Sequence, residues 1–165
     1  MHGQMLGIYL NDHLAGSTAG VGLARRIARA HRRSPRGAEL ARLANEIAQD
    51  RHDLLAIMHA LGHAPRRHKV LAGWAGERVA RLKLNGRLVR RSGLSRLVEV
   101  EALRLGTEGK ACLWATLLVV APGQPGLDED RLQGLLDRAQ EQIDTLEGLR
   151  LTASAKVFTA GRAKA

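Results

Sequence analysis

The apolar residues of this chain recur at three- and four-residue steps over four long stretches. Each stretch therefore places a single apolar stripe along one side of a helix. The pattern predicts long helices at about 5–33, 38–61, 94–120 and 127–157, and a shorter helix at about 68–84. The second stretch shows the clearest stripe, which consists of Leu40, Leu43, Ile47, Asp50, Leu54, Ile57 and Leu61.

Turn signals separate the predicted helices and indicate their directions. They are Ser34-Pro35, Gly62 and Pro122-Gly-Gln-Pro-Gly. The first and last turns are short, so the helices on either side of each form an antiparallel pair. The bridge after Gly62 is long enough, at about 1.5 Å per helical residue, to return to the other end of the bundle. The sequence therefore predicts one all-α domain over 1–165, a four-helix bundle with a long helical crossover between helices two and three.

Two antiparallel helix pairs joined by one long crossover form the arrangement of ferritin-like bundles. In the order and direction of its helices the chain resembles the ferritin-like four-helix-bundle superfamily over nearly its whole length. The phrases YLNDHLAG and NGRLVRRSGLSRLVEVEALRLGTEGKACLW are also similar to an uncharacterised bacterial branch of small helical proteins. The resemblance implies the fold and carries no function to this chain.

Composition favours a helical protein of the cytoplasm. Only 2% of the 165 residues are aromatic, and the abundance of Ala, Leu and Arg favours helices over a β-sandwich. A single cysteine, Cys112, excludes an intrachain disulfide. The first residues lack the basic start of a signal peptide, and the longest uncharged apolar run, 111–121, is too short to cross a bilayer. We therefore expect a cytoplasmic location and no membrane partner.

Several polar residues interrupt the predicted stripes at a similar depth. His13, Asp50 and Glu108 each lie on or beside a stripe, about two to three turns from the same end of the bundle. Burying one unpaired carboxylate costs several kcal/mol, against a total stability of about 5–15 kcal/mol for a domain. These groups must therefore be paired, protonated, hydrated, bound to a metal or outside the core.

Two interpretations of this polar layer remain open. In one, His13 bridges the acids in a buried network with Arg51 or Arg104, and such networks can fix the register of helices. In the other, His13, Asp50 and Glu108 bind a single divalent metal, for which nitrogen and carboxylate ligands suit zinc, iron or manganese.

A di-iron centre of the ferritin-like type is not expected. The resemblance implies a Glu from each of two helices and a Glu-x-x-His pair from each of the other two. The second stretch has Glu46-Ile-Ala-Gln49 in place of such a pair, and the fourth stretch contains no His.

The sequence contains no recognisable catalytic motif. Cys112 lies on an apolar stretch with no His beside it, which favours a small core residue over a nucleophile. Gly109-Lys110 is followed by Ala111, whereas a phosphate-binding loop requires Ser or Thr there. We therefore do not expect an enzyme.

The formal net charge of +10 allows a polyanionic partner. Basic residues gather at 25–36 and 83–91, which the predicted topology places at one end of the bundle. An Ala- and Arg-rich coding bias explains the same excess, and one Tyr and one Phe give little surface for stacking bases. The candidate residues for nucleic-acid binding are Arg32, Arg33, Arg87, Arg90 and Arg91.

These observations rank three functions. The first is a non-catalytic structural or interaction bundle with a buried polar layer. The second is a metal-binding ferritin-like protein, and the third is a basic nucleic-acid-binding protein. Because the stretch at 94–120 is apolar almost all round, we also expect a homodimer.

Overall fold

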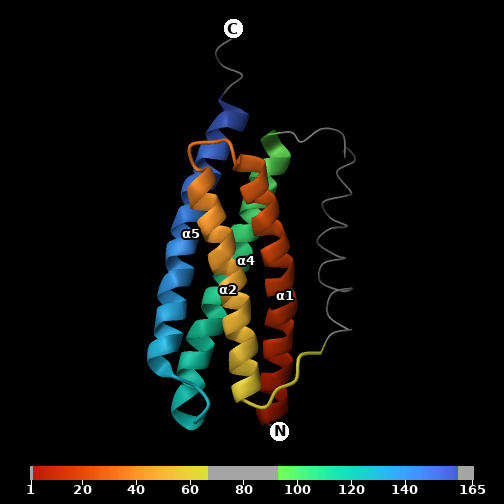
Figure 1. Cartoon of the computed structure of the whole chain (residues 1–165), viewed down its shortest axis with the longest axis vertical. Coiled ribbons are helices and arrows are strands. Elements are labelled where there is room, and N and C mark those ends of the chain that lie inside the picture. Colours follow the sequence, from red (N-terminus) through yellow and green to blue (C-terminus); the bar gives the residue numbers. More distant parts are fainter. Residues whose placement is uncertain (1, 67–92, 160–165) are drawn as a thin grey trace.

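The computed structural model describes residues 2–66 and 93–159, and these fold into four long helices without a strand among them (Figure 1). The helices are α1 (His2–His31), α2 (Gly37–Ala60), α4 (Gly93–Val120) and α5 (Glu129–Phe158). A short 3₁₀ turn, η1 (Ala121–Gly123), follows α4. The all-α prediction is confirmed for this part of the chain. The predicted helix at 68–84 lies outside the described residues.

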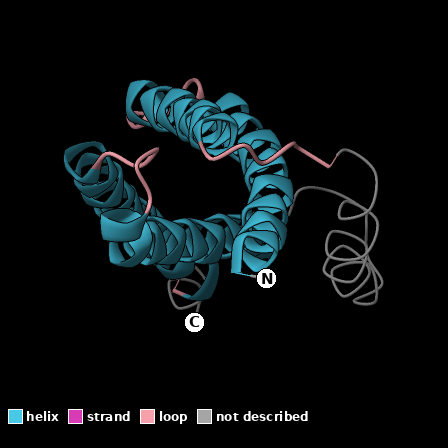
Figure 2. Cartoon of the chain, turned by 90° about the horizontal axis from the view of Figure 1, so that it is seen from below, coloured by secondary structure: helices cyan, strands magenta, loops and turns pink. Residues whose placement is uncertain are grey.

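The helices form two antiparallel hairpins, α1 with α2 and α4 with α5 (Figure 1). Helices α2 and α4 run in the same direction, so the end of α2 and the beginning of α4 lie at opposite ends of the bundle. Helix α1 packs against α2 and α4, and α4 packs against α5. The backbones of α2 and α5 lie farther apart than those of the other neighbouring pairs, as the end-on view shows (Figure 2).

Local signals explain where the helices end. Gly62 has a φ of +71°, and its N–H donates to the carbonyl of His59 while the N–H of His63 donates to that of Met58. This is a Schellman motif, which requires the left-handed conformation that glycine adopts at little cost. At the other hairpin, the Asp128 carboxylate accepts a bond from the N–H of Arg131 at 3.0 Å and so caps α5.

Gly37 begins α2 because of a close approach of the backbone. A Cβ atom at this position would lie 2.8 Å from the carbonyl oxygen of Arg32 in the turn after α1. The tight α1–α2 turn therefore excludes a side chain at this position.

The apolar interior is divided into two clusters, one near each end of the bundle. The cluster near the end where α2 finishes includes Leu10, Leu54, Trp114, Leu117 and Leu132. The cluster near the other end includes Ile27, Leu40, Val100, Leu103 and Leu146. Between them the helices contribute polar side chains, and this layer contains the candidate site.

Candidate functional site

Three polar residues occupy core positions midway along their helices. Asp50 of α2, Lys110 of α4 and Gln142 of α5 continue the stripes of buried residues on their helices at three- and four-residue steps. The exposed fractions of the Asp50 and Lys110 side chains are 2% and 12%, and Gln142 is 1% exposed. Helix α1 contributes Ser17 at this depth, whose hydroxyl donates to the carbonyl of Leu14 at 2.7 Å. We call Asp50, Lys110 and Gln142 the buried layer.

The three residues of the buried layer bond to one another. The Lys110 ammonium donates to Oδ2 of Asp50 and to Oε1 of Gln142. Nε2 of Gln142 donates to Oδ2 of Asp50 at 3.1 Å. The layer thus ties α2, α4 and α5 together through one carboxylate.

Arginines of α5 complete the layer from its edge. Nε of Arg138 donates to Oδ1 of Asp50 at 2.7 Å, and its terminal NH2 donates to Oδ2 of Asp53 at 2.9 Å. Arg131 donates to the other oxygen of Asp53 at 2.8 Å. Both carboxylates therefore have a charged donor on each oxygen, which is the condition under which buried charge is tolerated.

Burial and charge act in opposite directions on the cations of this site. Burial lowers the pKa of Lys110, and the attraction of Asp50 offsets only part of that effect. For Arg138, burial also lowers the pKa, but its bonds to Asp50 and Asp53 outweigh it and raise the pKa overall. A lysine with a lowered pKa is a common feature of catalytic sites. Here its ammonium donates to Asp50 and Gln142, so a cation and a carboxylate lie together in the core.

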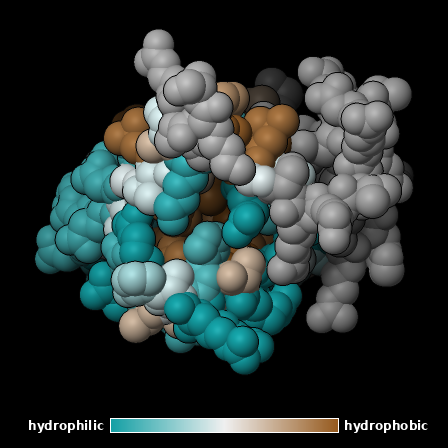
Figure 3. All heavy atoms as spheres, turned by 90° about the horizontal axis from the view of Figure 1, so that it is seen from above, coloured by the Kyte–Doolittle hydropathy of each residue, from teal (hydrophilic) through white to brown (hydrophobic). Residues whose placement is uncertain are grey.

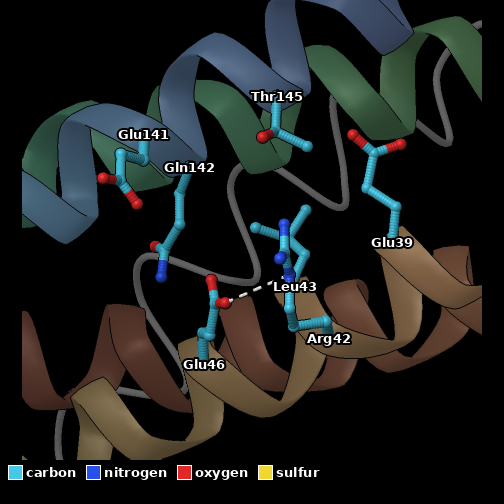
Figure 4. Close-up of a pocket in the computed structure, with 7 residues that line it drawn as sticks. All are labelled: Glu39, Arg42, Leu43, Glu46, Glu141, Gln142 and Thr145. Carbon is cyan, nitrogen blue, oxygen red and sulfur yellow. Dashed lines mark ion pairs between the residues drawn. The ribbon is translucent and has the colours of Figure 1, made fainter.

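A small polar cleft lies between α2 and α5 beside the layer (Figure 4). Its volume is about 80 Å³. It is lined by Glu39, Arg42, Leu43, Glu46, Glu141, Gln142 and Thr145. Gln142 thus belongs both to the buried layer and to the wall of this cleft. Glu46 pairs with Arg42 at 3.5 Å, and Glu39 pairs with Arg36 at 2.7 Å, so most of the acidic lining is already matched by cations.

The structure does not bring the three predicted metal ligands together. Asp50 lies in the buried layer as predicted, but the Glu108 side chain is 45% exposed and pairs with Arg104 of its own helix at 3.3 Å. His13 is half-buried and its ring meets Tyr9 edge-on, with 4.5 Å between ring centroids. Among residues 2–66 and 93–159 there is no group of three His, Cys, Asp or Glu side chains that could hold a metal ion.

His13 also does not bridge the acids as the predicted network required. Burial lowers the pKa of His13, and the nearby charge of Asp12 only partly opposes this shift. Arg104 instead joins α4 to α5 through Glu147 at 2.9 Å, and Arg51 donates to the hydroxyl of Thr18 at 3.0 Å. The network exists, but its cations are Lys110 and Arg138.

Sequence reasoning missed Lys110 and Arg138 for different reasons. Lys110 lies on the stripe Val100, Leu103, Thr107, Lys110, Trp114 and Leu117, so its position on the stripe was a usable signal. Arg138 lies beside the α5 stripe and reaches Asp50 with a long side chain, and no spacing rule predicts that reach.

The predicted nucleic-acid-binding residues fall in two groups. Arg32 and Arg33 are exposed in the turn between α1 and α2. Arg87, Arg90 and Arg91 lie outside the described residues.

Comparison of the chain with models of protein families, with curated proteins and with solved structures found no match. None of the helices in 2–66 and 93–159 combines the length and apolar composition needed to cross a membrane.

Proposed function

We propose that this protein is a non-catalytic structural and interaction bundle whose buried layer fixes the pairing of its helices. The observation that carries the proposal is the complete pairing of Asp50. Its two oxygens accept bonds from Lys110, Gln142 and Arg138, so the group has neither a free base nor a free acid to offer a substrate. A buried ionic group adds little stability compared with apolar residues, and its best-attested use is to specify register.

The position of the layer supports this role. It lies between two apolar clusters, and apolar contacts are non-directional, so they specify the register of a helix less sharply than paired charges do. A shifted helix would leave Asp50 or Lys110 buried without its partner, at a cost of about 3–5 kcal/mol. The layer therefore penalises wrong registers more than it stabilises the correct one.

The test replaces the layer with apolar residues of similar size. In Asp50→Leu/Lys110→Met/Gln142→Leu, the free energy of unfolding should stay within about 1 kcal/mol of wild type or increase. The amide NMR spectrum should show more than one set of signals for α2 and α5, because the register is no longer specified. A stable variant with a single sharp spectrum would overturn the proposal.

The ferritin-like fold is part of this proposal. Its support is the parallel direction of α2 and α4, which places the end of α2 and the beginning of α4 at opposite ends of the bundle (Figure 1). A connection between opposite ends is the feature that distinguishes the ferritin-like arrangement from a simple up-down-up-down bundle.

We also propose a cytoplasmic location, for which the single cysteine of the sequence is the support.

We further propose that two copies pair through the outer side of α4. An uncharged stripe runs along this side at three- and four-residue steps. It consists of Val98, Ala102, Leu105, Gly109, Cys112, Thr116 and Val119. The expectation that Cys112 is a core residue was wrong, because its position on this stripe leaves it exposed. Leu105 is 57% exposed and Val119 is 82% exposed, although α4 is flanked by α1 and α5. An exposed apolar stripe of this length is typical of a helix that packs against a partner.

Light scattering on the intact chain tests the homodimer. We expect twice the chain mass for wild type and the monomer mass for Leu105→Glu, while Glu108→Gln, on the neighbouring side of α4, should remain dimeric. A monomeric wild type at all accessible concentrations would remove the homodimer from the proposal and leave the role of the buried layer intact.

A metal-binding function is the alternative that this proposal competes with. Metal analysis of protein purified without chelator or affinity metal separates the two. Stoichiometric zinc, iron or manganese that is lost in His13→Ala would favour the alternative, and substoichiometric metal would favour the structural role.

A further inference from the structure

One side of the α1–α2 hairpin carries arginines that form no ion pair with an acid of the described residues. Thr18, Arg25 and Arg29 recur at seven- and four-residue steps and so share one side of α1. The hydroxyl of Thr18 accepts a bond from Arg51 of α2, at 3.0 Å. This contact shows that the side in question borders α2. We call these arginines, Arg25, Arg29 and Arg51, together with Arg32 and Arg33 of the turn that follows α1, the basic face.

The acids of the hairpin lie elsewhere. Those of α2 are Glu39, Glu46, Asp50 and Asp53, and each either pairs with α5 or lines the cleft towards it. The acid of α1, Asp12, lies six residues before Thr18, about a third of a turn round the helix. The carboxylates of this hairpin are therefore directed away from the basic face.

The arginines of the basic face lack ion pairs within the described part of the chain. Arg25, Arg29, Arg32 and Arg33 are exposed. By contrast, Arg26 pairs with Glu99 of α4 at 3.3 Å. Like charges four residues apart, as at Arg25 and Arg29, destabilise a helix by about 0.2–0.5 kcal/mol.

The helix dipole accounts for only part of this arrangement. It favours cations in the last turn of α1, where Arg29 lies. It does not account for Arg25, which lies before the last turn, nor for Arg51, in the middle of α2. A face with four exposed arginines that form no ion pair within the described part of the chain is suited to an external anion.

We propose that the basic face binds the phosphate backbone of nucleic acid. Arg25 lies six residues, about 9 Å, before the end of α1 at His31, a length that spans about three phosphates of one DNA strand, and Arg32 and Arg33 follow in the turn. Arginine binds phosphate oxygens through two parallel N–H groups. Contacts to phosphates alone carry no sequence information, so the binding is sequence-independent.

The surroundings of the basic face favour nucleic acid over a membrane surface. Peripheral membrane helices insert large apolar side chains beside their cations. The large exposed hydrophobic residues in the described part of the chain are Met5, Ile8, Leu94, Leu105, Val119, Leu151 and Phe158. In the sequence, none of these residues belongs to α1 after Thr18, to the turn that follows α1, or to α2. The view onto the end of the bundle likewise shows hydrophilic residues on one side and hydrophobic residues gathered on the other (Figure 3).

Two variants of equal charge test the proposal on the full chain. Arg25→Gln/Arg29→Gln removes two cations from the basic face, and Arg42→Gln/Lys156→Gln removes two exposed cations from outside it. Each protein is titrated into a labelled DNA duplex of about 20 base pairs at several salt concentrations, and binding is followed by fluorescence anisotropy. Circular dichroism verifies that both variants are folded. The cations at 67–92 are common to both proteins, so only the difference between the variants is interpreted.

We expect the basic-face variant to lose about 1.8 units of the slope of log K against log salt, and about ten- to sixtyfold in affinity near 0.1 M salt. The control variant should bind like wild type. Equal losses in both variants would mean that net charge alone drives binding, and absence of any binding by wild type would equally overturn the proposal. Binding to phosphatidylserine vesicles is measured in parallel. If the basic-face variant loses affinity for the vesicles but binds DNA as wild type does, the face belongs to a membrane contact and the proposal is overturned.

Discussion

Arginines on the two sides of α2 differ in whether they are paired with acids. Towards α5, Arg138 and Arg131 each bond to a carboxylate of α2 at 2.9 Å or less. On α1, Arg25 and Arg29 are exposed and form no ion pair within residues 2–66 and 93–159. The same residue type is structural where acids neutralise it and available to a partner where they do not. Net charge alone, at +10, does not reveal this division.

The largest effect should come from removing the shared carboxylate of the buried layer. Asp50→Ala leaves Lys110 and Arg138 without a common partner, in a site where the Lys110 side chain is only 12% exposed. We expect a loss of about 3–5 kcal/mol in the free energy of unfolding, measured by urea denaturation. A loss below about 1 kcal/mol would show that the layer is not a determinant of the fold.

A matched pair of arginine variants should sharpen the comparison at an intermediate magnitude. Arg138→Gln removes donors from two carboxylates of the α2–α5 interface and should cost about 1–2 kcal/mol, since its side chain is partly exposed. Arg29→Gln on the basic face should change stability by less than about 0.5 kcal/mol. Equal losses in thermal or urea unfolding would contradict the division into structural and available arginines.

A smaller, pH-dependent effect should come from His13. This residue is half-buried, and so is intermediate between the buried charges of the layer and the exposed arginines of the basic face. Burial lowers its pKa in the folded protein below the ordinary value of 6.5. As the pH falls below 6.5, His13 is protonated in the unfolded chain before it is protonated in the folded protein. The free energy of unfolding therefore decreases as the pH falls through this range.

Unfolding of wild type and His13→Gln at several pH values between about 7 and 5 measures this effect. We expect the stability of wild type to fall relative to the variant as the pH decreases. A difference that stays constant, or that grows in favour of wild type at low pH, would show that His13 is not desolvated.

The sequence by itself determined the helices and the presence of charge in the core. Apolar steps of three and four residues and the turn signals at Gly62 and Pro122 sufficed to place four long helices, because these signals act over a few residues. Asp50 was recognisable as buried because it continues the α2 stripe without interruption.

Only the tertiary structure decided which charges meet. A change of one position rotates a side chain by about 100° round a helix. Thr107 is therefore buried, whereas Glu108 lies at the edge of α4 and pairs with Arg104. The partners of Asp50 come from two other helices, and their approach depends on how far apart α2 and α5 pack. The same packing directs the acids of α2 towards α5, so Arg25 and Arg29 of α1 form no ion pair within residues 2–66 and 93–159.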